Sequence, residues 1–395
     1  MHRHRRLLPA HRPDTRVARG AGPERRQHRR ARPSGAAAGR PCHRHPFDLT
    51  PTGTHCMTAR TILVTGGAGF IAGYFALELA DTDDKLVMLD VKAPGPEAEW
   101  MLRDVQRRIT YVKGGVDDAQ TVLDTCRDHG VTDIVHMASI VNPAFLASHP
   151  KQAFDINVGG TMNVLAAMHQ LKLRRLVCFS TIGVLPAVQY EPIDANHPVL
   201  LGTQGPGASF YGAAKVASEA FCFAYRQSFG LDFVIIRPSA VYGFGMQWPI
   251  YIKPVVENSI AGLPTRFPHG HDFPRDYTHA ADVAQIARRA LDAPSAALHD
   301  RIFYGASGAP LVTAGQMAQM VRDQVPGADI QIGPGLSEDD LVEISYRGVL
   351  DVDTGRRQLG YVPRFASLQD GIADYIATQR RYLAETQPAS EAATA

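Results

Sequence analysis

The chain has 395 residues and a net charge of +2, and its 45% hydrophobic and 20% charged residues are ordinary for a globular protein. It contains no uncharged apolar run of about 18 residues, so the sequence predicts no membrane span and no membrane partner. The five cysteines have neither CxxC nor Cys/His ligand spacing, which argues against a metal site. They are expected to be reduced packing thiols in a cytoplasmic protein: Cys42, Cys56, Cys126, Cys178 and Cys222.

The charge is unevenly distributed. Residues 1–56 carry thirteen arginines and no lysine against three acidic residues, a balance of +10 that leaves −8 for the remainder. This segment lacks apolar periodicity and is expected to be disordered. A nucleic-acid-binding tail and an Arg-rich transit peptide are alternatives. We favour translated upstream sequence with the natural start at Met57, and therefore expect no nucleic-acid partner.

The first regular pattern follows Met57. Two apolar runs, TILV and KLVMLD, enclose the glycine turn TGGAGFIA and the helical stretch YFALELA. Strand, glycine turn, helix and strand make up the dinucleotide-binding unit. Gly66 allows the tight turn and Gly69 lets the backbone approach a pyrophosphate. Phe70 and Ile71 then open the helix whose unpaired amides would face that group.

The acid at the end of the second run indicates which dinucleotide binds. Asp90 lies 24 residues beyond Gly66, where a carboxylate accepts from both hydroxyls of a ribose. A carboxylate there repels a 2′-phosphate, so NAD is favoured over NADP. Lys92, two residues later, leaves NADP as an alternative cofactor.

The alternation continues beyond this unit. Strands are predicted in 109–112, 133–139, 174–181 and 232–243, with helices over 157–171 and 211–230 between them. Strands alternating with helices predict an α/β fold with a Rossmann-type, doubly wound parallel sheet. After about residue 240 shorter helices and Gly/Pro-rich loops replace this pattern, which predicts a smaller C-terminal α/β lobe that binds substrate.

The stretch YGAAK places Tyr211 and Lys215 four residues apart on one helix face. A nearby ammonium favours the phenolate and lowers the phenol's pKa, which would let Tyr211 move a proton near neutral pH. The same spacing also recurs on exposed helices without function. Thr181 ends a predicted strand and would face the same crevice as Gly66, because ligands bind at the carboxyl ends of parallel strands.

Taken in order, TGGAGFIA, Asp90, HMAS, NVGGTMNVL, ST and YGAAK resemble the extended short-chain dehydrogenase/reductases. More narrowly, the chain is similar to the NAD-dependent epimerase/dehydratase group that includes UDP-galactose 4-epimerase. The later stretches RPSAVYG, PRDYTHAADVA and LGYVPRFASLQDGI also match, so the resemblance runs from about Thr61 to Leu383.

The resemblance implies roles for individual residues. Tyr211 would be the acid/base, Thr181 would polarise the same substrate oxygen, and Lys215 would bind the nicotinamide ribose and lower the pKa of Tyr211. Further implied contacts are Asp117 to adenine, Ala138 to the cofactor, Pro238 to the nicotinamide amide and Arg275 to a nucleotide-sugar pyrophosphate. Asn157 would be a structural or relay residue, or a helix cap, and Asp282 is interpreted as a helix-capping residue.

Departures from the family pattern restrict which of the family's reactions and substrates are expected. Thr181 is followed by Ile182 and Gly183, which cannot move protons, where dehydratase members have an acid pair; dehydration is therefore disfavoured. Ala240 replaces an asparagine that contacts the nucleotide sugar, and Leu185 replaces a tyrosine. The histidines near Arg275 are interpreted as a polar rim of the substrate cleft, with no metal bound.

The sequence therefore predicts an NAD-dependent sugar epimerase, with a nucleotide sugar as one candidate substrate, acting through Thr181, Tyr211 and Lys215. The alternative is an NAD-dependent dehydrogenase that oxidises a secondary alcohol of a sugar, sugar acid or other small molecule. An NAD-binding sensor is disfavoured because all three residues are present. A cytoplasmic homodimer is expected, with these segments: a basic extension (1–56), an NAD-binding domain (57–240), a substrate lobe (241–386) and a frayed tail (387–395).

Overall fold

The structure is a computed structural model that describes residues 59–199, 205–248 and 250–386. The chain separates into two units, Met1–Cys56 and Met57–Ala395, and every described residue belongs to the second. The expectations for residues 1–56, for a start at Met57 and for the tail 387–395 therefore lie outside the described residues.

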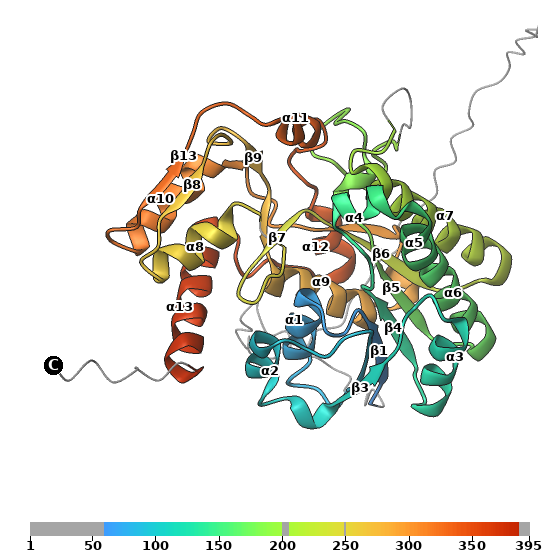
Figure 1. The fold of residues 1–395 in the computed structure, drawn as a ribbon. Coiled ribbons are helices and arrows are strands. Elements are labelled where there is room, and N and C mark those ends of the chain that lie inside the picture. The colour runs from blue at the N-terminus through green and yellow to red at the C-terminus, as the bar shows by residue number, and fades with distance from the viewer. Residues whose placement is uncertain (1–58, 200–204, 249, 387–395) are drawn as a thin grey trace, which may run out of the picture. The chain divides into compact units, whose positions relative to one another are not determined.

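Within the described residues, seven parallel strands form the central sheet, in the order β11-β6-β5-β4-β1-β2-β3 (Figure 1). The chain enters this sheet at an inner strand, β1, and later strands are added on both sides of it. This confirms the predicted doubly wound arrangement. The strands are β1 (Thr61–Thr65), β2 (Lys85–Asp90), β3 (Ile109–Lys113), β4 (Asp133–His136), β5 (Arg175–Phe179), β6 (Phe233–Pro238) and β11 (Ile302–Gly305).

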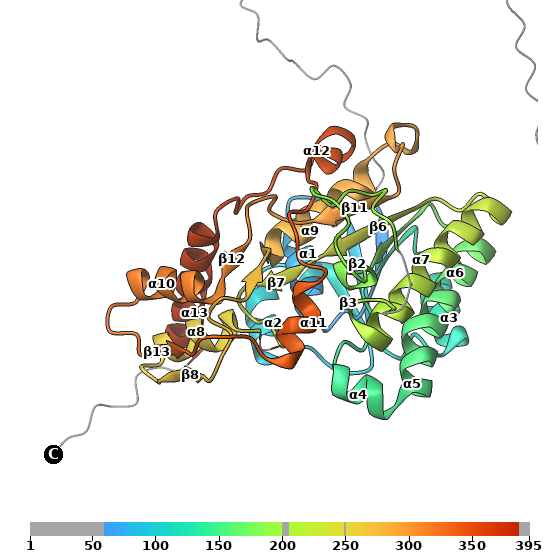
Figure 2. The ribbon, with the colours of Figure 1, turned by 90° about the horizontal axis from the view of Figure 1, so that it is seen from above.

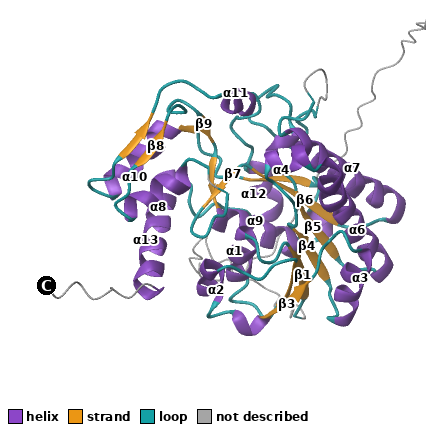
Figure 3. Cartoon of the chain, in the orientation of Figure 1, coloured by secondary structure: helices purple, strands orange, loops and turns teal. Residues whose placement is uncertain are grey.

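Helices cover both faces of this sheet (Figure 3). Successive strand residues alternate between the two faces: Ile62 and Val64 pack in one buried cluster and Leu63 in the other. Burying such a side chain contributes about 1.5–3 kcal/mol, so apolar runs buried on both sides fix these strands in the core. One face carries α1 (Phe70–Glu78), α9 (Ala280–Asp292) and α12 (Asp353–Leu359), and the other carries α3 (Ala119–Asp128), α6 (Gly160–Leu171) and α7 (Ser209–Phe229).

The prediction of one strand over 232–243 is wrong. The sheet strand β6 ends at Pro238, and after Ser239 a separate strand, β7 (Ala240–Tyr242), pairs in parallel with β10 (Tyr277–His279) outside the central sheet. Proline has no N–H to continue a ladder, so the strand pairing changes at this point.

The smaller C-terminal lobe lies beside the sheet, at the left of Figures 1 and 2. Its helices pack around a third buried cluster that includes Val255, Met317 and Ile372. The lobe is built from α8 (Ile252–Ile260), α10 (Ala314–Gln324), α13 (Leu368–Thr386) and the pairs β8 (Thr265–Phe267) with β13 (Ile330–Ile332) and β9 (Pro274–Arg275) with β12 (Val312–Thr313). The predicted boundary at residue 240 stays a prediction.

Short helices complete the fold: α2 (Pro96–Leu102), α4 (Pro143–Ser148), α5 (Pro150–Phe154) and α11 (Glu338–Ile344). A π-helical turn, η2 (Asp155–Gly159), precedes α6, and the 3-10 turns are η1 (Gln106–Arg108), η3 (Ile182–Val184) and η4 (Ser295–Ala297). None of the helices within the described ranges is long and apolar enough to cross a membrane.

Candidate active site

The glycine turn between β1 and α1 is pressed against the ends of two strands. Gly66 has a φ of +72°, and a Cβ on this residue would lie 2.9 Å from the amide nitrogen of Ala138. The amides of Gly66 and Gly67 both donate to the Leu89 carbonyl, at 2.9 and 3.2 Å. The turn therefore needs glycine both for its backbone conformation and for its close contact with the end of β4.

The residues around this turn fit a dinucleotide. Gly69 caps α1 with no side-chain hydrogen bond, so the first amides of that helix can face a pyrophosphate. Binding of that group by Gly69, Phe70 and Ile71 stays a prediction. Just beyond β4 and β5, the hydroxyls of Ser139 and Ser180 are buried and have no partner among the described residues. Buried polar groups are normally paired, so these two hydroxyls indicate a polar ligand along this edge of the sheet.

The other predicted cofactor residues lie along the same edge. Asp90 ends β2, and its carboxylate accepts from the amides of Ala68, at 3.1 Å, and Lys92, at 3.2 Å. Asp117 is exposed in the loop after β3, and Pro238 ends β6. The carboxyl ends of parallel strands share one edge, so the fold brings these residues to the edge that also carries Gly66.

Tyr211 and Lys215 lie in the first two turns of α7. Tyr211 is half-buried, whereas Lys215 is 1% exposed. The Lys215 Nζ donates to the Phe179 carbonyl at 2.8 Å and lies 5.7 Å from the centroid of the Tyr211 ring. Thr181 follows two residues after Phe179, and its Oγ1 accepts from the Gly183 amide at 3.1 Å. One turn of α7 is therefore fastened to the strand end that carries Thr181.

Close glycine contacts hold the turn after β5 against the start of α7. A Cβ on Gly212 would lie 2.4 Å from the Gly183 carbonyl, and a Cβ on Gly183 would lie 2.5 Å from the Cβ of Ala208. The Ala208 amide also donates to that Gly183 carbonyl, at 3.0 Å. The turn η3 and the start of α7 thus approach to backbone contact, which sets Thr181 near the first turn of α7.

The electrostatics differ from the prediction in one respect. Burial raises the pKa of the Tyr211 phenol, and burial lowers the pKa of Lys215. The expected lowering of the Tyr211 pKa by Lys215 is not seen, because the ammonium is directed at the Phe179 carbonyl instead of the phenol oxygen.

A buried network of hydrogen bonds lies behind Lys215, and no sequence pattern predicted it. Thr65 Oγ1 lies 2.7 Å from His136 Nδ1, His136 Nε2 lies 3.1 Å from Thr161 Oγ1, and Thr161 lies 3.0 Å from the Ser218 hydroxyl. Burial and the neighbouring Lys215 lower the pKa of His136 to about 3, so this imidazole is neutral. This network joins β1, β4, α6 and α7 without adding a charge to the interior.

Asn157 has a structural position in the π-turn. Its side chain accepts from the Ile140 amide at 2.8 Å and donates to the Ile140 carbonyl at 3.0 Å. It does not cap α6, so that alternative is wrong. Asn157 instead fixes the loop that follows β4, next to the unpartnered Ser139.

Arg275 lies in a buried charge cluster. It is 6% exposed, its guanidinium carbon lies 4.3 Å from the Phe273 ring centroid, and its Nη2 donates to Glu343 Oε2 at 3.2 Å. Arg347 donates to the same carboxylate oxygen at 2.7 Å and to the Ser239 hydroxyl at 3.0 Å. Sequence reasoning missed Glu343 and Arg347, because they lie about 70 residues after Arg275 and belong to no local pattern.

This cluster is connected to the segment that precedes α7. Arg347 contacts Ser239, the residue after Pro238, while a Cβ on Gly207 would lie 2.2 Å from the ring of Tyr346. Tyr346 also belongs to the buried cluster that contains Ile182, Val184 and Leu185. Tyr346 and Arg347 therefore link Arg275 to the end of β6 and to the segment that precedes Tyr211.

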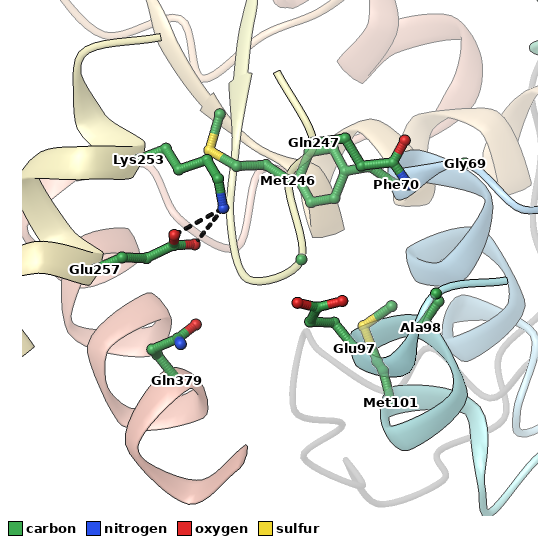
Figure 4. A pocket seen from close by; sticks show the side chains of 12 residues that line it. Gly69, Phe70, Glu97, Ala98, Met101, Met246, Gln247, Lys253, Glu257 and Gln379 are labelled. Atoms are coloured by element: carbon green, nitrogen blue, oxygen red, sulfur yellow. Dashed lines mark hydrogen bonds and ion pairs between the residues drawn. The ribbon is translucent and has the colours of Figure 1, made fainter. Parts of the chain in front are cut away.

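A separate cavity of about 350 Å³ is lined by residues at the start of α1 and in α2, α8 and α13 (Figure 4). Gly69 and Phe70 line one side of it, and Lys253, Glu257 and Gln379 of the C-terminal lobe line another. Tyr211, Lys215 and Thr181 do not line this cavity, so it lies outside the proposed reaction centre.

The remaining predicted polar residues have structural contacts. His279 caps α9 by accepting from the Ala281 amide. Asp282 accepts from the amides of Arg364 and Phe365, so it holds the loop between α12 and α13. The interpretation of Asp282 as a helix-capping residue is therefore wrong. In the part of the chain that the structure describes, no group of three His, Cys, Asp or Glu side chains is arranged to hold a metal ion.

Comparison with known proteins identifies the family. The model of the NAD dependent epimerase/dehydratase family matches residues 62–304. The chain belongs to this family. A putative UDP-glucose 4-epimerase of Methanocaldococcus jannaschii is 30% identical over 246 residues, covering 58% of this chain and 73% of that protein. A UDP-glucose 4-epimerase of Lacticaseibacillus casei is 27% identical over 252 residues, covering 59% and 73%.

Solved structures of the family have the same fold. The UDP-glucose 4-epimerase of Thermus thermophilus, solved with NAD, has a TM-score of 0.66 at 25% identity and covers 81% of this chain and 99% of its own. An L-threonine dehydrogenase of Cupriavidus necator has a TM-score of 0.69 at 22% identity, covering 80% and 99%. As a member of the epimerase/dehydratase family, the chain is an NAD-dependent enzyme with oxidoreductase-type chemistry.

Proposed function

We propose that this enzyme epimerises a sugar at a hydroxyl-bearing carbon, with Thr181, Tyr211 and Lys215 as its catalytic residues. One observation supports this above all: the buried Lys215 and the phenol of Tyr211 lie one helical turn apart, and that turn is fastened to the strand end carrying Thr181. These groups can hold and move a hydroxyl proton at the sheet edge where the glycine turn fits NAD.

Each side chain has a separate task in this proposal. Tyr211 takes the proton from the substrate hydroxyl and returns it, and Thr181 holds the same oxygen by a hydrogen bond. NAD, when bound, supplies the acceptor for the hydride and, in its oxidised form, a positive charge near the phenol. Lys215 would hold the nicotinamide ribose, Gly66, Gly69, Phe70 and Ile71 the pyrophosphate, and Asp90, Asp117, Ala138 and Pro238 the rest of the cofactor.

The surroundings of Thr181 support a reaction without elimination of water. Ile182 is 2% exposed, and Gly183 is in backbone contact with α7. Neither residue has a group that can give or take a proton, and Leu185 is fully buried among apolar side chains. The acid and base that a dehydratase needs are therefore missing from the positions after Thr181.

Dehydrogenation of a smaller secondary alcohol is the second candidate. It is favoured by Ala240, which is 6% exposed and offers no amide to a nucleotide sugar. The two candidates differ in what happens to the reduced cofactor. An epimerase must keep it between its two half-reactions, whereas a dehydrogenase releases it.

Cofactor content tests this difference. Protein is desalted thoroughly, denatured and assayed for released NAD and NADH. We expect about one cofactor per chain and no net NADH formation during turnover of the correct sugar. An empty protein that binds added NAD reversibly and accumulates NADH with sugar acids or polyols would instead identify a dehydrogenase.

Replacing Asp90 with asparagine is expected to weaken the preference for NAD over NADP by about tenfold, since one charge facing a dianionic 2′-phosphate is removed. The amide keeps one oxygen as acceptor for the Ala68 or Lys92 amide, so the turn should persist. Dissociation constants of both cofactors measure the change. An unaltered ratio would show that another residue reads the ribose.

We also propose that the enzyme is a cytoplasmic homodimer. Phe221, 40% exposed, and Phe229, 54% exposed, place large aromatic side chains on the outer surface of α7, and such exposed apolar groups favour association. Light scattering of the purified protein gives the mass in solution, and a monomer at micromolar concentration would contradict the proposal.

A further inference from the structure

The Arg275 cluster contains an anion of its own. Glu343 extends from α11, which lies between the C-terminal lobe and helices α4 and α7 in both Figures 1 and 2. Its Oε2 accepts from Arg275 at 3.2 Å and from Arg347 at 2.7 Å. Although burial opposes ionisation, the pairs with Arg347 and Arg275 hold the pKa of Glu343 below its ordinary value. The carboxylate is therefore charged at neutral pH.

The two arginines still have donors to offer. Arg275 Nε, Arg275 Nη1 and Arg347 Nε are buried and have no acceptor among the described residues. The guanidinium carbon of Arg275 also lies 5.2 Å from the Tyr251 ring centroid, in addition to its contact with Phe273, so its plane is fixed by stacking. A buried guanidinium held in this way, with free N–H groups, is a site for an oxyanion.

The net charge of the cluster limits which oxyanion fits. Arg275 and Arg347 contribute two positive charges and Glu343 removes one. Asp276, 3% exposed, lies near Arg347, and burial raises its pKa to about 7, so it removes up to one more. The remaining charge lies between zero and +1. It can balance at most one carboxylate and falls short of the two negative charges of a pyrophosphate diester.

We propose that Glu343 is a specificity-determining residue that tunes the Arg275–Arg347 pair to a substrate with a single carboxylate, a sugar acid, and against nucleotide diphosphates. The proposal rests on the proposed NAD-dependent function and names the substrate class of that site. Arg275 keeps its predicted role of binding an anionic substrate group, but the anion is a carboxylate instead of a pyrophosphate.

Equilibrium titration of the NAD-saturated protein with three probes tests this. The probes are glucose, glucuronate and UDP-glucose, which carry zero, one and two negative charges. The wild type is expected to bind glucuronate more tightly than UDP-glucose. In Glu343→Gln the affinity for glucuronate should rise about 5-fold, and that for UDP-glucose by the square of this factor, about 25-fold, because Coulomb energy scales with ligand charge. The affinity for glucose should not change.

Two variants serve as controls. Glu343→Asp keeps the charge and should retain the order of affinities of the wild type, and Glu338→Gln removes an exposed acid from the same helix and should change nothing. Tight binding of UDP-glucose by the wild type with no response to glucuronate would overturn the substrate class, even if Glu343→Gln failed to fold. Equal changes for all three probes would overturn the role of Glu343. Neither result depends on turnover, so cofactor content still tests the proposed function separately.

Discussion

Replacing Tyr211 with phenylalanine is expected to lower kcat by about 10²–10⁴-fold, the usual contribution of a positioned acid/base, while NAD remains bound. The change removes one oxygen atom from a half-buried side chain. Lys215 keeps its bond to the Phe179 carbonyl, and the glycine contacts between η3 and α7 do not involve the phenol. Turnover of the correct sugar and the NAD content per chain measure the two parts of this prediction.

A matched control comes from the same helix. Tyr225 lies on α7 three turns beyond Lys215, where its ring packs 5.3 Å from that of Phe229. Tyr225→Phe makes the same chemical change away from the sheet edge and should leave kcat near the wild-type value. Near-normal turnover of Tyr211→Phe would remove Tyr211 as the acid/base, and equal losses in both variants would point to damage of the helix.

The pH dependence follows from the burial of the phenol. Because burial raises the pKa of Tyr211, the fraction of phenolate should increase with pH throughout the neutral range. We therefore expect the rate of the proton-abstracting step to rise with pH as far as the protein stays folded.

Much of this site could be predicted because its signals are local. The turn from Gly66 to Gly69 needs glycine for reasons that act within a few residues, a positive φ and a backbone contact. Asp90 and Thr181 each follow an apolar run, and the carboxyl ends of parallel strands meet at one edge. Order along the chain was therefore enough to bring these groups together.

Features that depend on long-range packing could not be predicted. The run DFVIIRPSAVYG predicts one strand, yet the pairing partner changes at Ser239, because Pro238 lacks an N–H and the residues that follow pair with β10. Glu343 and Arg347 join Arg275 only because α11 returns across the lobe. No periodicity within the chain encodes a contact between residues so far apart.

The hydrogen-bond partners of individual side chains could not be predicted from the sequence either. A lysine four residues from a tyrosine predicts proximity, but the Phe179 carbonyl accepts from that ammonium and the phenol does not. In the same way, Asn157 precedes a helix as a cap would, yet the π-turn aims its side chain at Ile140. Sequence spacing places a side chain on a face without saying which acceptor it reaches.

Asp276→Asn is expected to make the protein more stable at high pH. Asp276 is 3% exposed, and burial raises its pKa from 3.8 to about 7. Between these pH values the native state holds a proton that the unfolded state has lost, so the free energy of unfolding falls as pH rises. The loss is complete above the native pKa and totals about 4 kcal/mol, at about 1.4 kcal/mol per pH unit. Asparagine has no proton to lose, and the variant should escape this penalty.

Urea unfolding at pH 5 and pH 8.5 measures the difference between the two proteins. At pH 5 the wild type should be within about 1.5 kcal/mol of Asp276→Asn, because its carboxyl is still mostly neutral in the native state and only about one pH unit of the loss has accumulated. At pH 8.5 the variant should be more stable by several kcal/mol. Asp339→Asn changes an exposed acid of α11 and should give no pH-dependent difference. Equal pH dependence in Asp276→Asn and the wild type would mean that Asp276 is ionised in the native state, with Arg347 balancing its charge. The net charge of the Arg275 cluster would then lie at the lower end of the range from zero to +1.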